Sequence, residues 1–245
     1  MHDGVDHFSV EGCVDTLYQL PNMSVGLSDF KSAIPVLWWR GVGHTHTAYA
    51  MESLLDMVAQ KTGKDPIELR LDLLNSDDMK QRRLADVLNI SRILSGWKKG
   101  NKRGFAAHYS YKTFVTVVAN VSATGKQIHI DKLHITVDCG IPVNPDVIRA
   151  QMEGGAGFGL GALLRNEITF VKGKVEQSNF DNYLPLRITD MPEIEVEIVM
   201  SHENPSGVGE PTVPPTGPAV ANAIFAVTGQ RILELPMTKS GFQFV

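Results

Sequence analysis

Cysteine is scarce in this chain, and long apolar runs are missing. Its 245 residues include only two cysteines, Cys13 and Cys139, which lie far apart and outside any CxxC spacing. This spacing supports neither a disulfide framework nor a zinc knuckle. Apolar residues make up 43% of the chain, enough to bury a core, yet no run reaches the length of a membrane-spanning helix. The first residues also lack the pattern of a signal peptide.

An excess of charge of one sign is missing as well. The chain has 23 basic and 27 acidic residues, a formal net charge of −4. This near balance gives no reason to expect a nucleic-acid partner or an anionic membrane surface. The one basic cluster, residues 98–103, is more typical of a solvated loop than of a phosphate site. Because the chain starts with a polar, turn-like stretch that leads straight into strand-like sequence, we expect it to be part of a longer protein.

Helical and strand periodicities occur in mixed order along the chain. Spacings of three and four, with caps and glycine stops, predict helices over residues 45–61, 66–74, 77–97 and 145–164 and one ending near residue 227. Alternation and turn residues predict strands over residues 14–20, 23–27, 36–39, 104–137 and 195–200, and a hairpin around Gly173. This order favours an α+β fold of mixed helices and antiparallel sheets over a doubly wound sheet. We predict two lobes, residues 1–103 and 104–245.

The stretch over residues 207–229 holds one carboxylate on a stiff loop. Gly207 and Gly209 flank Val208 and precede Glu210, and four prolines follow before an apolar helix. A rigid loop that presents a single acid suits a general base. The alternative is an ordinary Gly/Pro-rich turn with a solvated glutamate, and composition alone favours that alternative.

Two further polar residues precede glycines. Arg40 follows two tryptophans and precedes Gly41 at an expected helix start, where it could hold an anion or simply cap a turn and stack on Trp39. Gln151 precedes a run of five glycines and could donate to a ligand or lie on a helix surface. The glycines weaken an isolated helix, which indicates close approach to a neighbouring helix or a ligand.

Metal-ligating side chains are not indicated. His44 and His46 are two residues apart at the expected helix start, so they do not share a helical face and are interpreted as polar helix-entry residues. Glu52 lies further along the same helix and is predicted to face solvent. The sequence has no HExxH spacing.

Three ordered segments resemble a known family. They are WWRGVGHTHTAYAMES, RAQMEGGAGFGLGALL and GVGEPTVPPTGPAVANAIFAVTGQR. Together they resemble the C-terminal part of the molybdenum-binding large subunit of the xanthine oxidase family of molybdenum hydroxylases. The closest likeness is to the branch of isoquinoline 1-oxidoreductase, in its beta chain, over about residues 14–237.

The resemblance implies roles for particular residues. Glu210 matches the family's general base. Arg40 and Gly41 match a segment beside the molybdenum oxo ligand, and Gln151 matches a glutamine that contacts the pterin. The remaining positions implied to bind cofactor are Gly154, Gly155 and Gly209. The pterin dithiolene holds the metal in this family, so no protein side chain is expected to be a metal ligand.

The resemblance also implies a reaction and partners. It implies hydroxylation of N-heterocyclic aromatics or aldehydes with water as oxygen source, and a molybdopterin cofactor in its cytosine dinucleotide form. Electrons would leave through a small [2Fe-2S] partner subunit. Family large subunits are about three times longer, and the GQG-type motif and the other cofactor-binding domain are missing here. We therefore expect this chain to need the rest of the large subunit, and by itself to lack cofactor and activity.

Some alternatives stay open. A non-catalytic scaffold or partner-binding module that keeps the fold is the alternative to an enzyme. The resemblance implies a bacterial protein but leaves a cytoplasmic and a periplasmic or membrane-associated location equally open. The substrate, oligomeric state, parent length and final electron acceptor do not follow from the sequence.

Overall fold

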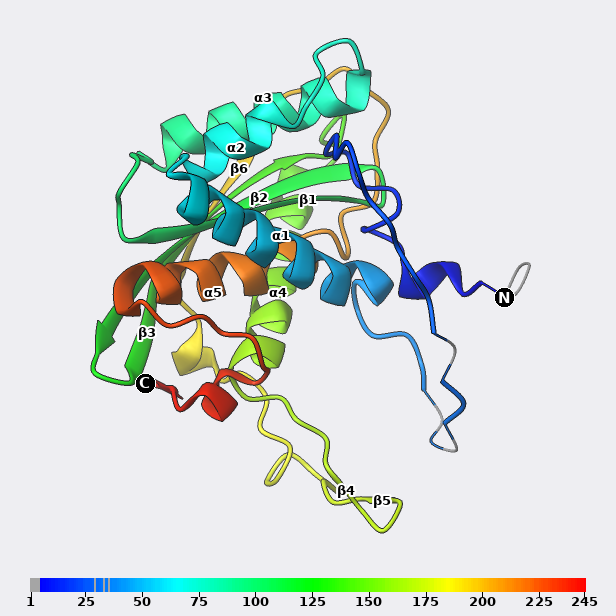
Figure 1. Cartoon of the computed structure of the whole chain (residues 1–245), viewed down its shortest axis with the longest axis vertical. Coiled ribbons are helices and arrows are strands. Elements are labelled where there is room, and N and C mark those ends of the chain that lie inside the picture. Colours follow the sequence, from blue (N-terminus) through cyan, green and yellow to red (C-terminus); the bar gives the residue numbers. More distant parts are fainter. Residues whose placement is uncertain (1–4, 29, 33, 35) are drawn as a thin grey trace.

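A mixed β-sheet forms the centre of the molecule (Figure 1). The computed structural model describes residues 5–28, 30–32, 34 and 36–245. Strands β1, β2 and β3 are antiparallel neighbours, while β6 and β7 both run parallel to β3. The strands of this sheet are β1 (Arg103–Ser110), β2 (Thr113–Thr124), β3 (Gln127–Asp138), β6 (Glu193–Ile198) and β7 (Gln243–Phe244). The parallel pairs are an addition to the predicted antiparallel sheet.

Alternation along the strands separates two cores, one on each face of the sheet. On β2, Val115 and Val117 belong to one buried cluster, whereas Phe114 and Val118 belong to the other. Successive side chains of a strand point to opposite faces of the sheet. Because β2 has apolar residues at both odd and even positions, both faces of the sheet must be covered by other elements. The predicted strands over residues 104–137 and the predicted α+β class are therefore confirmed.

Helices cover both faces of the sheet. Helices α2 and α3 pack on one face and α4 and α5 on the other, and α1 packs against α5 (Figure 1). Their bounds are α1 (Val42–Thr62), α2 (Pro66–Asp72), α3 (Met79–Leu94), α4 (Pro145–Leu164) and α5 (Val213–Thr228). Gly104 of β1 allows α5 to approach closely, because an added Cβ would collide with the Ala219 carbonyl and the Ala223 nitrogen. The predicted boundary between lobes at residue 103 stays a prediction.

The helix ends follow the sequence signals. Asp65 accepts hydrogen bonds from the amides of Ile67 (2.8 Å) and Glu68 (3.3 Å) and so caps α2. Gly63 and Gly229 end α1 and α5 with φ of 68° and 75°, in the left-handed region that favours glycine. The predicted cap and both predicted stops are confirmed.

Three strand predictions near the N-terminus are wrong. Residues 14–20 and 23–27 form turns and irregular chain, in a stretch of which residues 10–28 are all described. Val36–Trp39, predicted as a buried strand, is irregular, and Leu37 is 92% exposed. Short apolar runs resemble strands locally, but these find no edge of the sheet with which to pair. Their exposure leaves apolar surface available to another chain segment.

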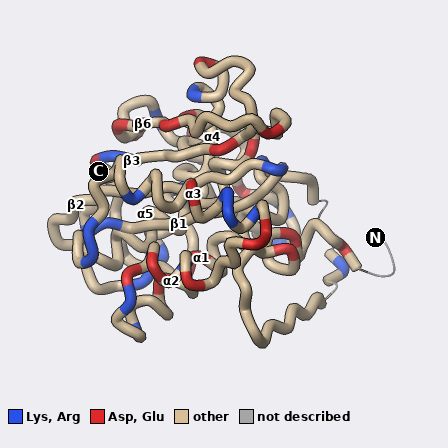
Figure 2. The backbone as a smooth tube through the Cα atoms, turned by 90° about the horizontal axis from the view of Figure 1, so that it is seen from above, with Lys and Arg blue, Asp and Glu red and all other residues tan. Residues whose placement is uncertain are grey.

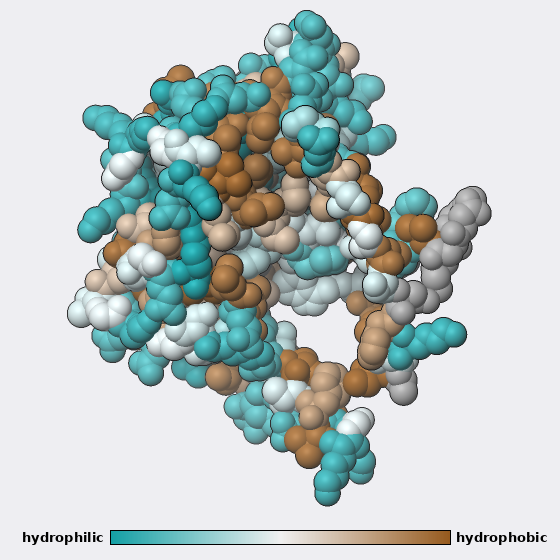
Figure 3. Space-filling view, viewed as in Figure 1, coloured by the Kyte–Doolittle hydropathy of each residue, from teal (hydrophilic) through white to brown (hydrophobic). Residues whose placement is uncertain are grey.

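Two arms project from the body of the molecule. One includes residues 36–39, and the other carries the predicted hairpin, formed by β4 (Phe170–Val171) and β5 (Lys174–Val175), with Gly173 in its turn at φ 78°. Apolar side chains lie along both arms, which border an opening (Figure 3). Exposed apolar side chains on the arms include Val36, Leu37, Trp38, Phe170, Val171 and Phe180. Exposed apolar side chains are thus gathered on the two arms rather than scattered singly over the surface.

Basic and acidic residues are intermixed along the described backbone (Figure 2). Among the described residues, no helix combines the length and apolarity needed to cross a bilayer. The short 3-10 helices are η1 (His7–Ser9), η2 (Ile188–Asp190) and η3 (Met237–Ser240).

Candidate functional site

Three segments that are distant in the sequence meet at the N-terminus of α1. The Arg40 side chain joins them: its Nε donates to the Gly209 carbonyl at 2.7 Å, and its Nη2 donates to Gln151 Oε1 at 3.0 Å. A second bond from Nη2 also reaches the Gly209 carbonyl. The planar guanidinium can hold both partners at once because its donors have a fixed geometry. Arg40 thus ties α4 to the loop that carries Glu210, and neither caps a turn alone nor stacks on Trp39.

Glu210 lies at the start of α1 and is half-buried. The backbone amide of Gly41 donates to Glu210 Oε1 at 3.1 Å. The free amides at a helix N-terminus carry partial positive charge, which suits a carboxylate. Burial lowers the pKa of Arg40, and the negative charge of Glu210 counteracts that shift. The carboxylate is therefore held beside Arg40 rather than turned out into bulk water.

Position 41 requires glycine, whereas at position 209 the atoms of this chain would leave room for a side chain. Gly41 has φ 95°, and an added Cβ would collide with the Thr45 hydroxyl. An added Cβ at Gly209 would meet nothing within 4 Å. Gly209 therefore leaves open space beside the Arg40 and Glu210 side chains.

The glycines of α4 serve different contacts. An added Cβ at Gly155 would lie 3.1 Å from Thr212 Cβ, and one at Gly159 would lie 3.0 Å from the Val213 carbonyl. These two glycines let α4 pack closely on the start of α5. This close packing explains why α4 contains glycines that would weaken an isolated helix. Gly154 is exposed, and the nearest atom to an added Cβ is Arg40 Nη1 at 3.9 Å.

The structure shows a polar cluster near Glu210 that the sequence did not predict. His44 Nδ1 and His108 Nε2 are 3.0 Å apart and share a hydrogen bond. Glu11 accepts from the Gly43 amide at 2.8 Å, so a second carboxylate also binds the first turn of α1. The Tyr111 ring lies edge-on to His44, with centroids 5.4 Å apart. No local spacing signals this cluster, because its members come from three separate segments.

The buried histidines correct the interpretation of His44 as a polar helix-entry residue. His44 is only 7% exposed and does more than enter a helix. Burial lowers the pKa of His44, and it lowers the pKa of His108 to about 3. In the described part of the chain, no group of three or more His, Cys, Asp or Glu residues could hold a metal ion. Glu52, predicted to face solvent, is also buried, because it pairs with Arg70.

The low pKa of His108 predicts a pH-dependent stability. Below about pH 6.5 His108 is protonated in the unfolded state, whereas in the folded state it stays neutral down to about pH 3. The free energy of unfolding therefore decreases as the pH falls from about 6.5 towards 3. We expect urea unfolding at pH values from about 7 down to about 4 to give a shallower loss of stability in His108→Gln than in the unchanged chain. Replacing exposed His129 with asparagine is the control. An equal slope in His108→Gln and the unchanged chain would contradict this assignment.

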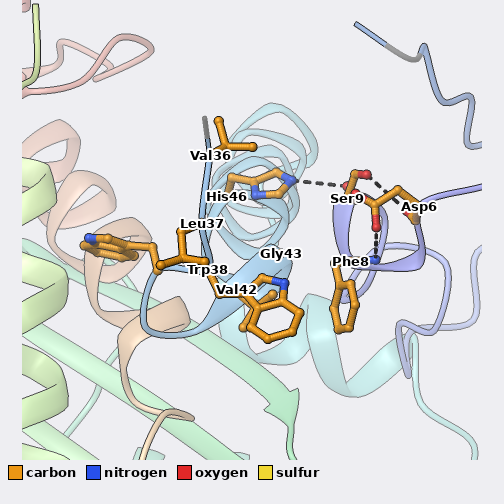
Figure 4. Close-up of a pocket in the computed structure, with 10 residues that line it drawn as sticks. Asp6, Phe8, Ser9, Val36, Leu37, Trp38, Val42, Gly43 and His46 are labelled. Atoms are coloured by element: carbon orange, nitrogen blue, oxygen red, sulfur yellow. Dashed lines mark hydrogen bonds between the residues drawn. The ribbon is translucent and has the colours of Figure 1, made fainter. Parts of the chain in front are cut away.

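One cavity lies apart from this cluster. It measures about 550 Å³ and lies between η1 and the irregular segment before α1. Phe8 faces Trp38 across it, with ring centroids 5.4 Å apart, and His46 bonds the Ser9 carbonyl (Figure 4). None of the predicted site residues lines this cavity, and its walls are mostly apolar.

The chain is similar to proteins of one family. Residues 54–192 match one molybdopterin cofactor-binding domain description, and residues 7–74 match another. The chain is 31% identical to the beta chain of isoquinoline 1-oxidoreductase of Brevundimonas diminuta over 90% of its length, which is 29% of that protein. It is 32% identical to a membrane-bound aldehyde dehydrogenase of Gluconacetobacter polyoxogenes, with 82% of the chain and 29% of that protein covered. A nicotinate dehydrogenase component of Pseudomonas putida is 29% identical, with 90% and 20% covered.

Solved structures share the fold. The aldehyde oxidoreductase of Desulfovibrio desulfuricans superimposes with a TM-score of 0.72 at 14% identity, over 81% of this chain and 40% of that one. The Desulfovibrio gigas enzyme gives 0.67 at 15% identity over the same shares. The chain spans less than a third of the length of the isoquinoline 1-oxidoreductase, aldehyde dehydrogenase and nicotinate dehydrogenase proteins that it matches. It belongs to the molybdopterin cofactor-binding domains of the molybdenum hydroxylase family.

Proposed function

We propose that this chain is the C-terminal molybdopterin-binding portion of a hydroxylase that oxidises N-heterocyclic aromatics or aldehydes with water as oxygen source. One observation carries the proposal: the Gly41 amide holds the Glu210 carboxylate beside Arg40. The Arg40 side chain in turn binds Gln151 and the Gly209 carbonyl. A base needs a fixed carboxylate next to an open site. Gly209 provides the open side, because nothing lies within 4 Å of an added Cβ there.

The donors around this opening suit an anionic, oxygen-rich cofactor. Arg40 supplies a positive charge, and Gln151 supplies an amide whose Oε1 is already engaged by Arg40, which turns its NH₂ group to other partners. Gly154 and Gly209 leave their sides uncovered. A bound molybdopterin, in the cytosine dinucleotide form, would supply the molybdenum and its two-electron chemistry. In this proposal Arg40, Gly41, Gln151, Gly154, Gly155 and Gly209 hold it.

Glu210 acts as the general base in this proposal. A glutamate carboxylate is anionic at neutral pH and can accept a proton. Its Oε1 accepts from the Gly41 amide, and the remaining lone pairs of the carboxylate can take the proton that the reaction releases. The stiff proline-rich start of α5 keeps the carboxylate in position while the reaction proceeds.

The relatives support the substrate class and the need for a larger assembly. Two are named for the N-heterocycles isoquinoline and nicotinate, and one for an aldehyde. The exposed apolar arms would be covered by the rest of a large subunit, and a small [2Fe-2S] subunit would carry electrons away.

The test uses the full assembly purified from its own cells. We expect about one molybdenum per large subunit, and turnover of an N-heterocycle or aldehyde with an artificial electron acceptor. In water enriched in ¹⁸O, the new oxygen of the product should carry the label. A fully occupied cofactor site with no turnover of either class would favour the scaffold alternative. Stoichiometric molybdenum in this 245-residue chain alone would refute its dependence on the rest of the subunit.

A further inference from the structure

The tight turn between β1 and β2 has an unusual backbone. Its two central residues, Tyr111 and Lys112, have φ of 54° and 63°. Two-residue hairpins of this kind need positive φ at both positions, and asparagine and glycine are the residues that adopt it readily. A bulky tyrosine there is a departure that local preference does not explain. Strained backbone of this kind is concentrated at functional sites.

The same turn holds the loop that carries Glu210. The Gly207 amide donates to the Tyr111 carbonyl at 3.2 Å, and the Thr113 hydroxyl donates to the Gly207 carbonyl at 2.7 Å. An added Cβ at Gly207 would lie 3.1 Å from Tyr111 Cβ, so the two segments are in close contact. The position of Tyr111 and the position of Glu210 are therefore set together.

The Tyr111 hydroxyl is buried and lies near the Glu210 carboxylate. Among the described residues no hydrogen bond of full geometry reaches it. Burial raises its pKa, and the negative charges of Glu210 and then Glu11, together with hydrogen bonding towards Glu210, raise it further, while the His44 ring lies edge-on beside it. The phenol thus stays a neutral donor at neutral pH. A buried donor without an acceptor is costly, and the nearby carboxylate is the acceptor that would relieve it.

We propose that Tyr111 is a positioning residue for Glu210, whose hydroxyl donates to the carboxylate oxygen that the Gly41 amide does not hold. With both oxygens held, the carboxylate has one orientation towards the opening beside Gly209. The strained turn places the phenol there. This inference rests on the proposed role of Glu210 as general base.

The first test reads Tyr111 directly in this chain. 3,5-Difluorotyrosine, whose phenol ionises several pH units below that of tyrosine, is incorporated at position 111 and followed by ¹⁹F NMR against pH. We expect Glu210→Gln to lower its apparent pKa by roughly one unit or more, because the neighbouring anion is lost. The same label at Tyr49, which donates to the Ile232 carbonyl and senses burial alone, should not respond. An unchanged titration at position 111 overturns the proposal.

The second test uses the full assembly. Tyr111→Phe removes only the hydroxyl, and we expect kcat to drop by about 10- to 100-fold with KM unchanged, the loss expected for a hydrogen bond to a charged group. Circular dichroism checks that the variant folds. If Tyr111→Phe keeps full activity while Glu210→Gln is inactive, the proposed role of Tyr111 is wrong but the proposed function is not affected. Full activity in Glu210→Gln overturns the proposed function itself.

Discussion

Replacing Glu210 with glutamine in the full assembly is expected to lower kcat by about 10²- to 10⁴-fold, the usual contribution of a general base. Glutamine has nearly the same shape, and its carbonyl oxygen can still accept from the Gly41 amide. It cannot take up a proton at neutral pH, so the loss should fall on the chemical step. Steady-state kinetics gives kcat, and thermal unfolding together with molybdenum content shows whether the fold and the cofactor survive.

A second glutamate nearby provides the matched control. Glu203 precedes the same loop, is exposed, and has the same charge. Glu203→Gln is expected to keep full activity, since it removes an equal charge without touching the cluster around Arg40. If Glu210→Gln keeps full turnover while molybdenum stays bound, Glu210 is not the base.

Replacing Glu52 with alanine is expected to reduce the free energy of unfolding by about 3–5 kcal/mol, because it leaves a buried guanidinium without its partner. Arg70 and Glu52 are 0% and 1% exposed in their side chains, and Arg70 Nε donates to Glu52 Oε2 at 2.9 Å. The same carboxylate also accepts from the Ala107 amide at 2.8 Å and the Tyr18 hydroxyl at 3.0 Å. One side chain thus joins α1, α2, β1 and the N-terminal segment. Urea unfolding of the 245-residue chain measures the loss.

An exposed ion pair nearby shows how much burial matters. Lys64 and Asp72 are 2.7 Å apart but 51% and 55% exposed. Asp72→Ala should therefore change the free energy of unfolding by no more than about 1 kcal/mol. The double change Glu52→Leu with Arg70→Met should cost less than Glu52→Ala alone, because no charge is left unpaired. A loss in Glu52→Ala as small as that in Asp72→Ala would contradict the prediction.

Residue patterns that act over short distances were readable from the sequence. The cap at Asp65, the stops at Gly63 and Gly229, and the glycine-rich helix over residues 145–164 all follow from backbone preferences of neighbouring residues. The period-two stretch over residues 104–137 likewise requires two buried faces. The segments around Arg40, Gln151 and Glu210 were identified as one site by resemblance, not by any spacing between them.

Predictions from local sequence patterns were wrong where burial or strand pairing depends on a residue or strand distant in the sequence. Val36–Trp39 has the composition of a buried strand but is exposed, because none of the strands in the described part of the chain pairs with it. Glu52 has the composition of a surface residue but is buried, because Arg70 comes from another helix to neutralise it.

The sequence by itself determined the helices, the strands β1, β2, β3 and β6 of the central sheet and the single carboxylate on a proline-stiffened loop. Only the tertiary structure decided that the Gly41 amide would hold that carboxylate, that Arg40 would bind Gln151, and that Tyr111 would lie behind them. The reason is physical: backbone preferences are set within a few residues, whereas charge pairing and burial depend on which segments the folded chain brings together.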